Sequence, residues 1–134
     1  MNVLFLGAPG SGKGTQSKKI ETKFNIPQIS TGDLLRAETA SGSDIGEELK
    51  KIMSSGKFVS DDIVLKLVSK KITSNDCKNG FILDGFPRNL SQASSLDVLL
   101  NDLSVSIEYV FFIDVPTDLI IKRCVGRITC DTCG

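Results

Sequence analysis

The chain has 134 residues, which is enough for one domain of ordinary size and too few for two independent ones. Its hydrophobic content of 40% and charged content of 24% are typical of a globular protein in water. Sixteen basic residues balance sixteen acidic ones, so no net charge favours binding to nucleic acid or to an anionic membrane. No apolar run approaches the ~18 residues that cross a bilayer, and we expect a cytoplasmic protein whose cysteines stay reduced.

The sequence contains no histidine, which excludes Ser–His and Cys–His catalysis and metal sites that depend on histidine. Twelve lysines accompany only four arginines, which are Arg36, Arg88, Arg123 and Arg127. A general bias toward lysine is enough to explain this ratio. In a chain with that bias, however, the four positions that carry arginine are candidates for a specific role.

Short apolar runs and helical patterns alternate along the chain. In chain order we expect a strand at 3–6, a helix at 12–24, a short strand at 26–29, a helix with Thr31 as its N-cap, a helix that follows Ser60 and ends near 72, strands at 81–83 and 109–113, and a helix with Pro116 in its first turn. Strands that alternate with helices predict an α/β fold with a parallel sheet. Such sheets bind ligands at the carboxyl ends of their strands.

A glycine-rich loop separates the first strand from the first helix and reads Gly7-Ala8-Pro9-Gly10-Ser11-Gly12-Lys13-Gly14-Thr15. It contains the P-loop pattern G-x-x-x-x-G-K, although Gly14 stands between the lysine and Thr15, the expected hydroxyl. Glycines allow backbone N–H groups to turn toward phosphate oxygens, and the start of a helix adds positive partial charge. The loop is therefore predicted to bind a nucleoside triphosphate, with Lys13 reaching the β- and γ-phosphates.

Four further segments follow the segment GAPGSGKGTQ in order: PQISTGDLLR from residue 27, NGFILDGFPRN from 79 with Gln92 beyond it, FIDVP from 112 and RCVGRITCDTC from 123. Together the five segments resemble the motifs of the adenylate kinases in their bacterial long-lid form, and the resemblance covers essentially the whole chain. It implies a P-loop NTPase-like parallel sheet with flanking helices, the nucleoside monophosphate kinase fold. It also implies one core over residues 1–134, in which 30–59 form an inserted AMP-binding subdomain and 126–134 begin a lid.

The resemblance implies roles for individual residues. The ATP phosphates would be held by Gly10, Ser11, Gly12, Lys13, Gly14 and Thr15, with Arg123 and Arg127 lying over ATP. The AMP site would comprise Thr31, Arg36, Lys57, Phe58, Val59, Gly85, Phe86, Pro87, Arg88 and Gln92. In that site Gln92 would pair with the adenine edge, and Pro87 would follow a cis peptide bond. Asp33 and Asp84 would orient the waters around Mg²⁺, and the catalytic residues would be Lys13, Arg88, Arg123 and Arg127. All four arginines thus fall at nucleotide positions, where a guanidinium grips phosphate as an ammonium does not.

The implied reaction is the reversible transfer of a phosphoryl group from Mg-ATP to AMP, which gives two ADP. The attacking oxygen belongs to an ionised phosphate, so no general base is needed, and alignment and positive charge would supply the catalysis. A UMP/CMP-type nucleoside monophosphate kinase and a non-catalytic nucleotide-binding fragment are the alternatives. A kinase that acts on a hydroxyl would need a carboxylate base, for which Asp33 is the only well-placed candidate.

The last residues include Cys130-Asp131-Thr132-Cys133, a C-x-x-C spacing that is typical of half a structural zinc site or of a redox pair. The resemblance favours zinc in the lid. Two thiolates do not complete a tetrahedral site, and the pattern places Cys77 and Cys124 in the buried or helical body.

The family pattern continues beyond these motifs with the rest of the lid, a last strand and a closing helix, so we expect a truncated protein. The strand at 109–113 would then be an exposed apolar edge of the sheet. Without lid closure, water is not excluded from the site. We expect this chain by itself to be weakly active or inactive, and the complete protein to be a monomer.

Overall fold

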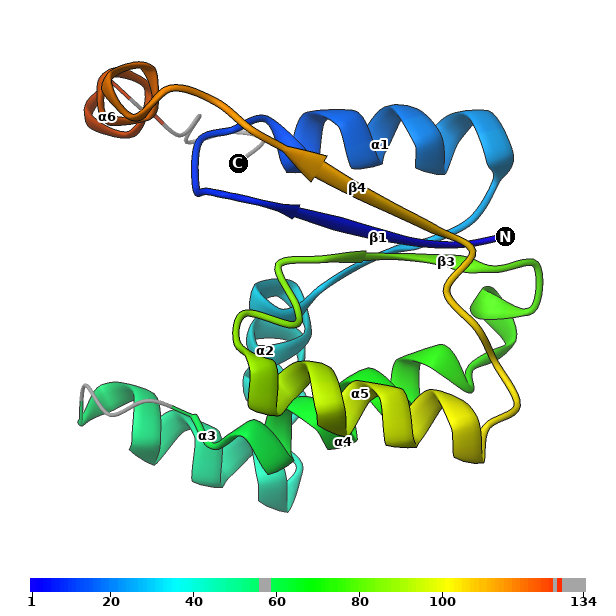
Figure 1. Cartoon of the computed structure of the whole chain (residues 1–134). Coiled ribbons are helices and arrows are strands. Elements are labelled where there is room, and N and C mark those ends of the chain that lie inside the picture. The colour runs from blue at the N-terminus through cyan, green and yellow to red at the C-terminus, as the bar shows by residue number, and fades with distance from the viewer. Residues whose placement is uncertain (56–58, 127, 129–134) are drawn as a thin grey trace.

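The computed structural model describes residues 1–55, 59–126 and 128, and in them a parallel sheet lies between helices (Figure 1). The strands are β1 (Asn2–Gly7), β2 (Gln28–Ser30), β3 (Phe81–Asp84) and β4 (Tyr109–Ile113). The α-helices are α1 (Lys13–Phe24), α2 (Thr31–Ala40), α3 (Asp44–Ser54), α4 (Asp61–Ile72), α5 (Leu90–Asp102) and α6 (Thr117–Val125), with a 3-10 helix η1 at Asn75–Cys77. In the part of the chain described here, no helix combines the length and the apolar character needed to cross a membrane.

The predicted α/β fold with a parallel sheet is confirmed, and all four expected strands are present. Two helix starts differ by one residue from the prediction, because Ser30 rather than Thr31 is the N-cap of α2, and Pro116 precedes α6 as its N-cap. Ser60 is the N-cap of α4, as predicted. The sequence did not lead us to predict α3 and α5.

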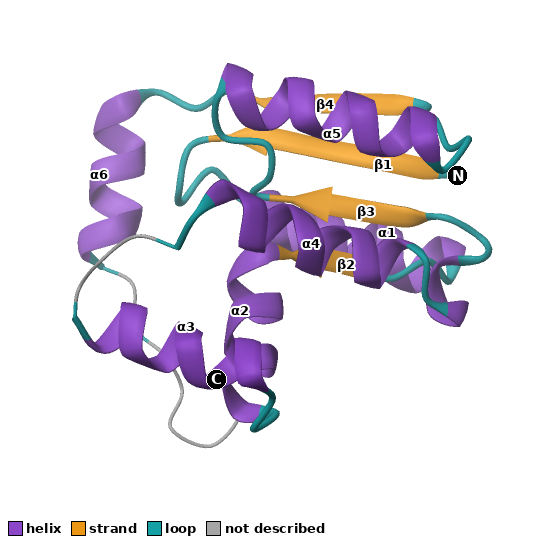
Figure 2. Cartoon of the chain, turned by 90° about the horizontal axis from the view of Figure 1, so that it is seen from below, coloured by secondary structure: helices purple, strands orange, loops and turns teal. Residues whose placement is uncertain are grey.

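The strand order is β2-β3-β1-β4, so β1 lies in the interior of the sheet. In the parallel register, Val3 pairs with Ile82 on one side and with Tyr109 on the other. The helices α4 and α5 cover one face of the sheet and α1 covers the opposite face (Figure 2). Because neighbouring strand residues point to opposite faces, β1 contributes Leu4 to the core under α4 and α5, and Val3 and Phe5 to the core under α1.

Cys77 is buried in the core under α4 and α5, as the pattern predicted, and burial raises the pKa of its thiol. The exposed Cys124 on α6 does not belong to a core. Both cysteines are free thiols.

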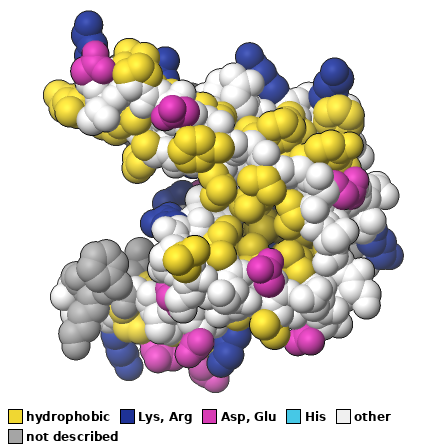
Figure 3. All heavy atoms as spheres, in the orientation of Figure 1, with side chains coloured by type: hydrophobic (Ala, Val, Ile, Leu, Met, Phe, Trp, Pro, Cys, Tyr) yellow, Lys and Arg dark blue, Asp and Glu magenta, His cyan; other side chains and the backbone are white. Residues whose placement is uncertain are grey.

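The strand β4 is the edge of the described sheet and is poorly covered. Its side chains Tyr109, Val110, Phe111 and Phe112 are 51%, 58%, 44% and 68% exposed. Figure 3 shows hydrophobic side chains gathered over the part of the surface where β4 runs in Figure 1. The expected exposed apolar edge at 109–113 is therefore present in the structure.

Candidate functional site

The P-loop leaves the carboxyl end of β1 and leads directly into α1. Gly12, the N-cap of α1, has a φ of +102° and lies in the left-handed region, which side chains with a Cβ rarely adopt. Gly7 has a φ of +144°, and a Cβ on it would lie 2.6 Å from the main-chain oxygen of Ile113 in β4. Glycine at these two positions thus permits both the turn and the close approach of the edge strand. Because the first amides of a helix have no partner within the helix, the loop presents backbone donors at the start of α1.

The Lys13 ammonium is held at the loop by two main-chain oxygens. Its Nζ donates to the oxygen of Gly7 at 2.8 Å and to that of Ala8 at 2.9 Å. An ammonium carries three N–H donors, so one is left for a ligand. In the same loop, the buried hydroxyl of Ser11 has no hydrogen-bond partner within the described residues.

A carboxylate from β3 lies next to the start of α1. The Oδ2 atom of Asp84 accepts a 2.7 Å hydrogen bond from Nε2 of Gln28, and a Cβ on Gly14 would lie 3.7 Å from the same oxygen. The main-chain N–H of Gln28 donates in turn to Glu21 on α1 at 3.0 Å. Two residues that sequence reasoning did not single out therefore fix the position of Asp84.

The turn after β3 presents Arg88. The peptide bond before Pro87 is cis, as the resemblance implied, and Phe86 inserts its side chain into the core with 2% exposure. The Nε atom of Arg88 donates to the oxygen of Gly85 at 2.7 Å. This contact directs the exposed guanidinium away from the core and toward the carboxyl ends of the strands.

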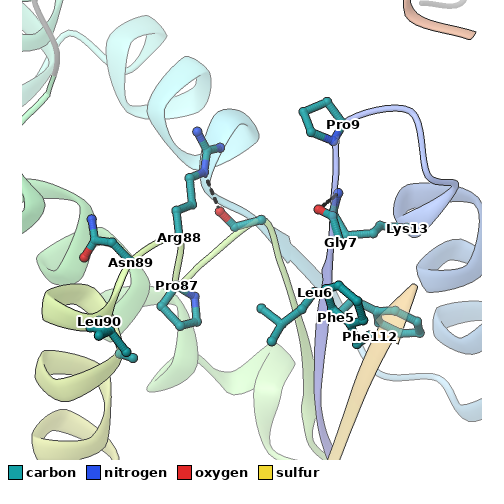
Figure 4. Close-up of a pocket in the computed structure, with 12 residues that line it drawn as sticks. Phe5, Leu6, Gly7, Pro9, Lys13, Pro87, Arg88, Asn89, Leu90 and Phe112 are labelled. Carbon is teal, nitrogen blue, oxygen red and sulfur yellow. Dashed lines mark hydrogen bonds between the residues drawn. The ribbon is translucent and has the colours of Figure 1, made fainter. Parts of the chain in front are cut away.

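Lys13 and Arg88 approach one cavity of about 700 Å³ from two sides (Figure 4). The P-loop forms one wall and the turn after β3, with the start of α5, forms the other. The lining residues are Phe5, Leu6, Gly7, Pro9, Lys13, Gly85, Pro87, Arg88, Asn89, Leu90, Ala93 and Phe112. Two cations from different elements thus border a cavity at the carboxyl ends of β1, β3 and β4.

The start of α2 carries three more of the predicted residues. Thr31 is buried, whereas Asp33 and Arg36 are exposed and form an ion pair three residues apart on the helix. The hydrogen bond from Arg36 holds the pKa of Asp33 below its usual value, with smaller contributions from Ser30 and from the charge of Lys18.

The helix α6 contacts the P-loop at its far end. Arg123 donates through Nη1 to the main-chain oxygens of Gly10 at 3.2 Å and of Ser11 at 3.5 Å. The thiol of Cys124 lies 3.7 Å from the main-chain oxygen of Pro9. Arg123 therefore lies against the P-loop, and the contact of Cys124 with it was not predicted.

The predicted site residues Lys57, Phe58, Arg127, Cys130 and Cys133 lie outside the described residues. Val59 is described and half-buried, just before α4. The structure brings the predicted residues of the P-loop, Arg88 and Arg123 to one end of the sheet. Across the described ranges, no group of three or more His, Cys, Asp or Glu side chains could hold a metal ion.

Comparison with known proteins gives one consistent result. The family model described as adenylate kinase matches residues 5–132. The chain is 52% identical over 134 residues to an adenylate kinase of Thermodesulfovibrio yellowstonii, and 47% and 46% identical to those of Archaeoglobus fulgidus and Oceanobacillus iheyensis. Each comparison covers 100% of this chain and 62% of the relative. The match to the family model spans nearly every residue of the P-loop fold described above, and the chain belongs to the adenylate kinase family.

Proposed function

We propose that the protein transfers a phosphoryl group reversibly between Mg-ATP and AMP, giving two ADP. The cavity bordered by Lys13 on one side and Arg88 on the other supports this proposal most strongly, because a reaction between two phosphates needs cations from both sides. The adenylate kinase names of the relatives agree with it. In this proposal the residues 30–59 hold AMP and the segment from 126 begins a lid.

ATP would enter with its phosphates on the P-loop, where the amides at the start of α1, the third N–H of Lys13 and Thr15 contact it. Arg123, held by the oxygens of Gly10 and Ser11, would lie over the same nucleotide. AMP would lie opposite, with Arg36 and Arg88 on its phosphate and Gln92 at its base. The attacking phosphate oxygen is already ionised, so the protein's task is to align the two phosphates and to balance their charge.

Asp84 fits an Mg²⁺ that carries water ligands, since its carboxylate lies beside Gly14 and is oriented by Gln28. Asp33 and Asp84 would orient the waters around the ion, and the charge of the magnesium would neutralise phosphate charge. Zinc in the lid, through Cys130 and Cys133, stays a prediction. We also propose a cytoplasmic monomer, in keeping with the free thiols of Cys77 and Cys124.

The test is an acceptor panel. The intact protein, meaning the complete protein rather than the 134-residue chain by itself, is supplied with Mg-ATP and with AMP, GMP, CMP or UMP in turn, and ADP formation is followed. Calorimetry measures the binding of ATP and AMP separately. We expect AMP to give the highest kcat/KM. Faster turnover of CMP or UMP would assign the protein to the UMP/CMP-type kinases, and binding without turnover would make it a nucleotide-binding module.

A further inference from the structure

The side-chain amide of Gln92 is held at both of its ends before any base is bound. Its Oε1 accepts from the main-chain N–H of Arg88 at 2.7 Å, and its Nε2 donates to Oδ1 of Asp61 at 2.6 Å. Its main-chain N–H donates to Asn89, the N-cap of α5, at 2.8 Å. The half-buried glutamine at the start of α5 is thus fixed in position and in orientation.

The two partners of the amide fix which way it faces. A main-chain N–H can only donate and a carboxylate can only accept, so the oxygen must face Arg88 and the nitrogen must face Asp61. Turning the amide by 180° would set the Nε2 hydrogens against the N–H of Arg88 and Oε1 against the carboxylate. The contact with Arg88 leaves one free lone pair on Oε1, and the contact with Asp61 leaves one free N–H on Nε2.

A free lone pair beside a free N–H matches one purine edge and not the other. Adenine offers its 6-amino group as donor and N1 as acceptor, whereas guanine offers O6 as acceptor and its N1–H as donor. A glutamine free to turn could pair with either edge. We propose that Asp61, on the neighbouring helix α4, is a positioning residue that fixes the amide of Gln92 and so makes the acceptor site select a 6-aminopurine over a 6-oxopurine; this rests on the proposed function.

The sequence does not point to this contact. Asp61 is the first residue of α4, and an acidic residue there normally favours the helix start through the helix dipole. Asp62, which follows it, has the same charge and is exposed in the same first turn. The hydrogen bond to Gln92, 31 residues away, distinguishes Asp61 from its neighbour.

The experiment compares three variants of the intact protein, Asp61→Ala, Asp61→Asn and Asp62→Ala, in the kcat/KM for AMP and for GMP with Mg-ATP. We expect Asp61→Ala to lower the AMP-to-GMP ratio by about tenfold, the size of one good base contact, mainly through KM. Asp61→Asn keeps an oxygen acceptor and should fall between Asp61→Ala and the parent. Asp62→Ala, which removes the same charge from the same helix start, should keep the parent ratio.

A second readout follows the amide itself. In ¹H–¹⁵N spectra of the nucleotide-free protein, the Gln92 side-chain signals should shift in Asp61→Ala and stay in place in Asp62→Ala.

A general loss of helix stability would affect the reactions with AMP and GMP equally and leave the AMP-to-GMP ratio of kcat/KM unchanged. A ratio in Asp61→Ala within twofold of that in Asp62→Ala overturns the inference and leaves the proposed function standing. A parent protein that does not phosphorylate AMP overturns both.

Discussion

At the scale of single residues, Lys13 and Arg88 differ in how many donors they have left for a ligand. Lys13 uses two of its three N–H groups on the oxygens of Gly7 and Ala8. Arg88 uses Nε on Gly85, and no hydrogen bond joins its two terminal nitrogens to any residue in the described ranges. A guanidinium held in this way can grip two phosphate oxygens at once, whereas the lysine supplies a single positioned charge.

In the proposed reaction, replacing Lys13 by methionine should nearly abolish phosphoryl transfer, because it would remove a charge beside the transferred phosphate. We expect a loss of at least about a hundredfold in kcat, or ~2.7 kcal/mol. Steady-state ADP formation by the intact protein measures it, and Lys19→Met, at an exposed position of α1, is the matched control. Retention of more than about a tenth of the parent rate would remove Lys13 from the mechanism.

Sequence reasoning placed the residues of the loop well and the contacts between distant residues poorly. The glycine and lysine spacing predicted where Lys13 lies because the loop is local and its geometry follows from a few neighbouring residues. The hydrogen bond from Gln28 to Asp84 joins residues 56 apart, and that from Gln92 to Asp61 joins residues 31 apart. Such pairs depend on how helices and strands pack, which no short motif encodes.

At the scale of the elements, Glu38 joins three helices. Its Oε1 accepts from the Ser43 hydroxyl at 2.5 Å, and its Oε2 lies 3.4 Å from the ammonium of Lys70 on α4. The same serine oxygen accepts from the N–H of Gly46 at 3.0 Å, at the start of α3. A Cβ on the buried Gly46 would collide with the main-chain oxygen of Glu38, so α2 and α3 meet closely at this corner.

The pKa of Glu38 lies below its ordinary value of 4.5, mainly because of the Ser43 hydrogen bond and then because of Lys70. A carboxyl with a lowered folded pKa stabilises the protein above its unfolded pKa and loses that contribution as the pH falls through the folded pKa. Glu38→Gln should therefore lower the free energy of unfolding at pH 7 by about 1 kcal/mol and reduce its decline below pH ~4.5.

Urea unfolding of the intact protein between pH 3.5 and 7 measures this difference, with Glu48→Gln, at an exposed position of α3, as control. If the free energies of unfolding of the parent and of Glu38→Gln change in parallel with pH, the contact between α2 and α3 does not depend on this carboxylate.

The elements predicted correctly are those with a continuous signal. The strands β1 and β3 appear as apolar runs because they lie in the interior of the sheet with helices over both faces, and α4 follows a clear cap at Ser60. The helix α5 was missed because serines interrupt its first two turns, although Asn89 caps it through a hydrogen bond to the N–H of Gln92. The helix α3 was missed although Asp44 and Glu47 lie in its first turn.

At the scale of the whole molecule, the apolar edge at β4 distinguishes this chain from a well-covered sheet. Phe111 stacks on Phe5 with ring centroids 5.3 Å apart, yet Phe112 on the other face is 68% exposed. A row of exposed apolar side chains on the edge strand of a sheet promotes association between chains.

The double variant Val110→Thr, Phe112→Thr of this 134-residue chain should bind less of the dye ANS and associate less than the parent. Threonine keeps a high strand propensity, so the strand should persist while the apolar surface shrinks. Dye fluorescence and sedimentation velocity over a concentration series measure the effect, and we expect at least a twofold fall in bound dye. Val98→Thr, at a 61% exposed position on α5, is the control. An equal fall in bound dye and in association in this control would show that β4 is not the surface through which the chains associate.

The position of β1 in the interior of the sheet also determines when, during synthesis, the P-loop can fold. The strand is synthesised before its neighbours β3 and β4, which begin only at Phe81 and Tyr109. The turn at Gly7 packs on Ile113, and Arg123 of α6 contacts Gly10 and Ser11, so the loop gains its last neighbours after more than a hundred residues of chain have been made. Closing such long loops is slow, because the chain loses conformational entropy before the stabilising contacts form. On the ribosome, a nascent chain of this protein should therefore acquire nucleotide affinity abruptly and late, once β4 and α6 have left the exit tunnel.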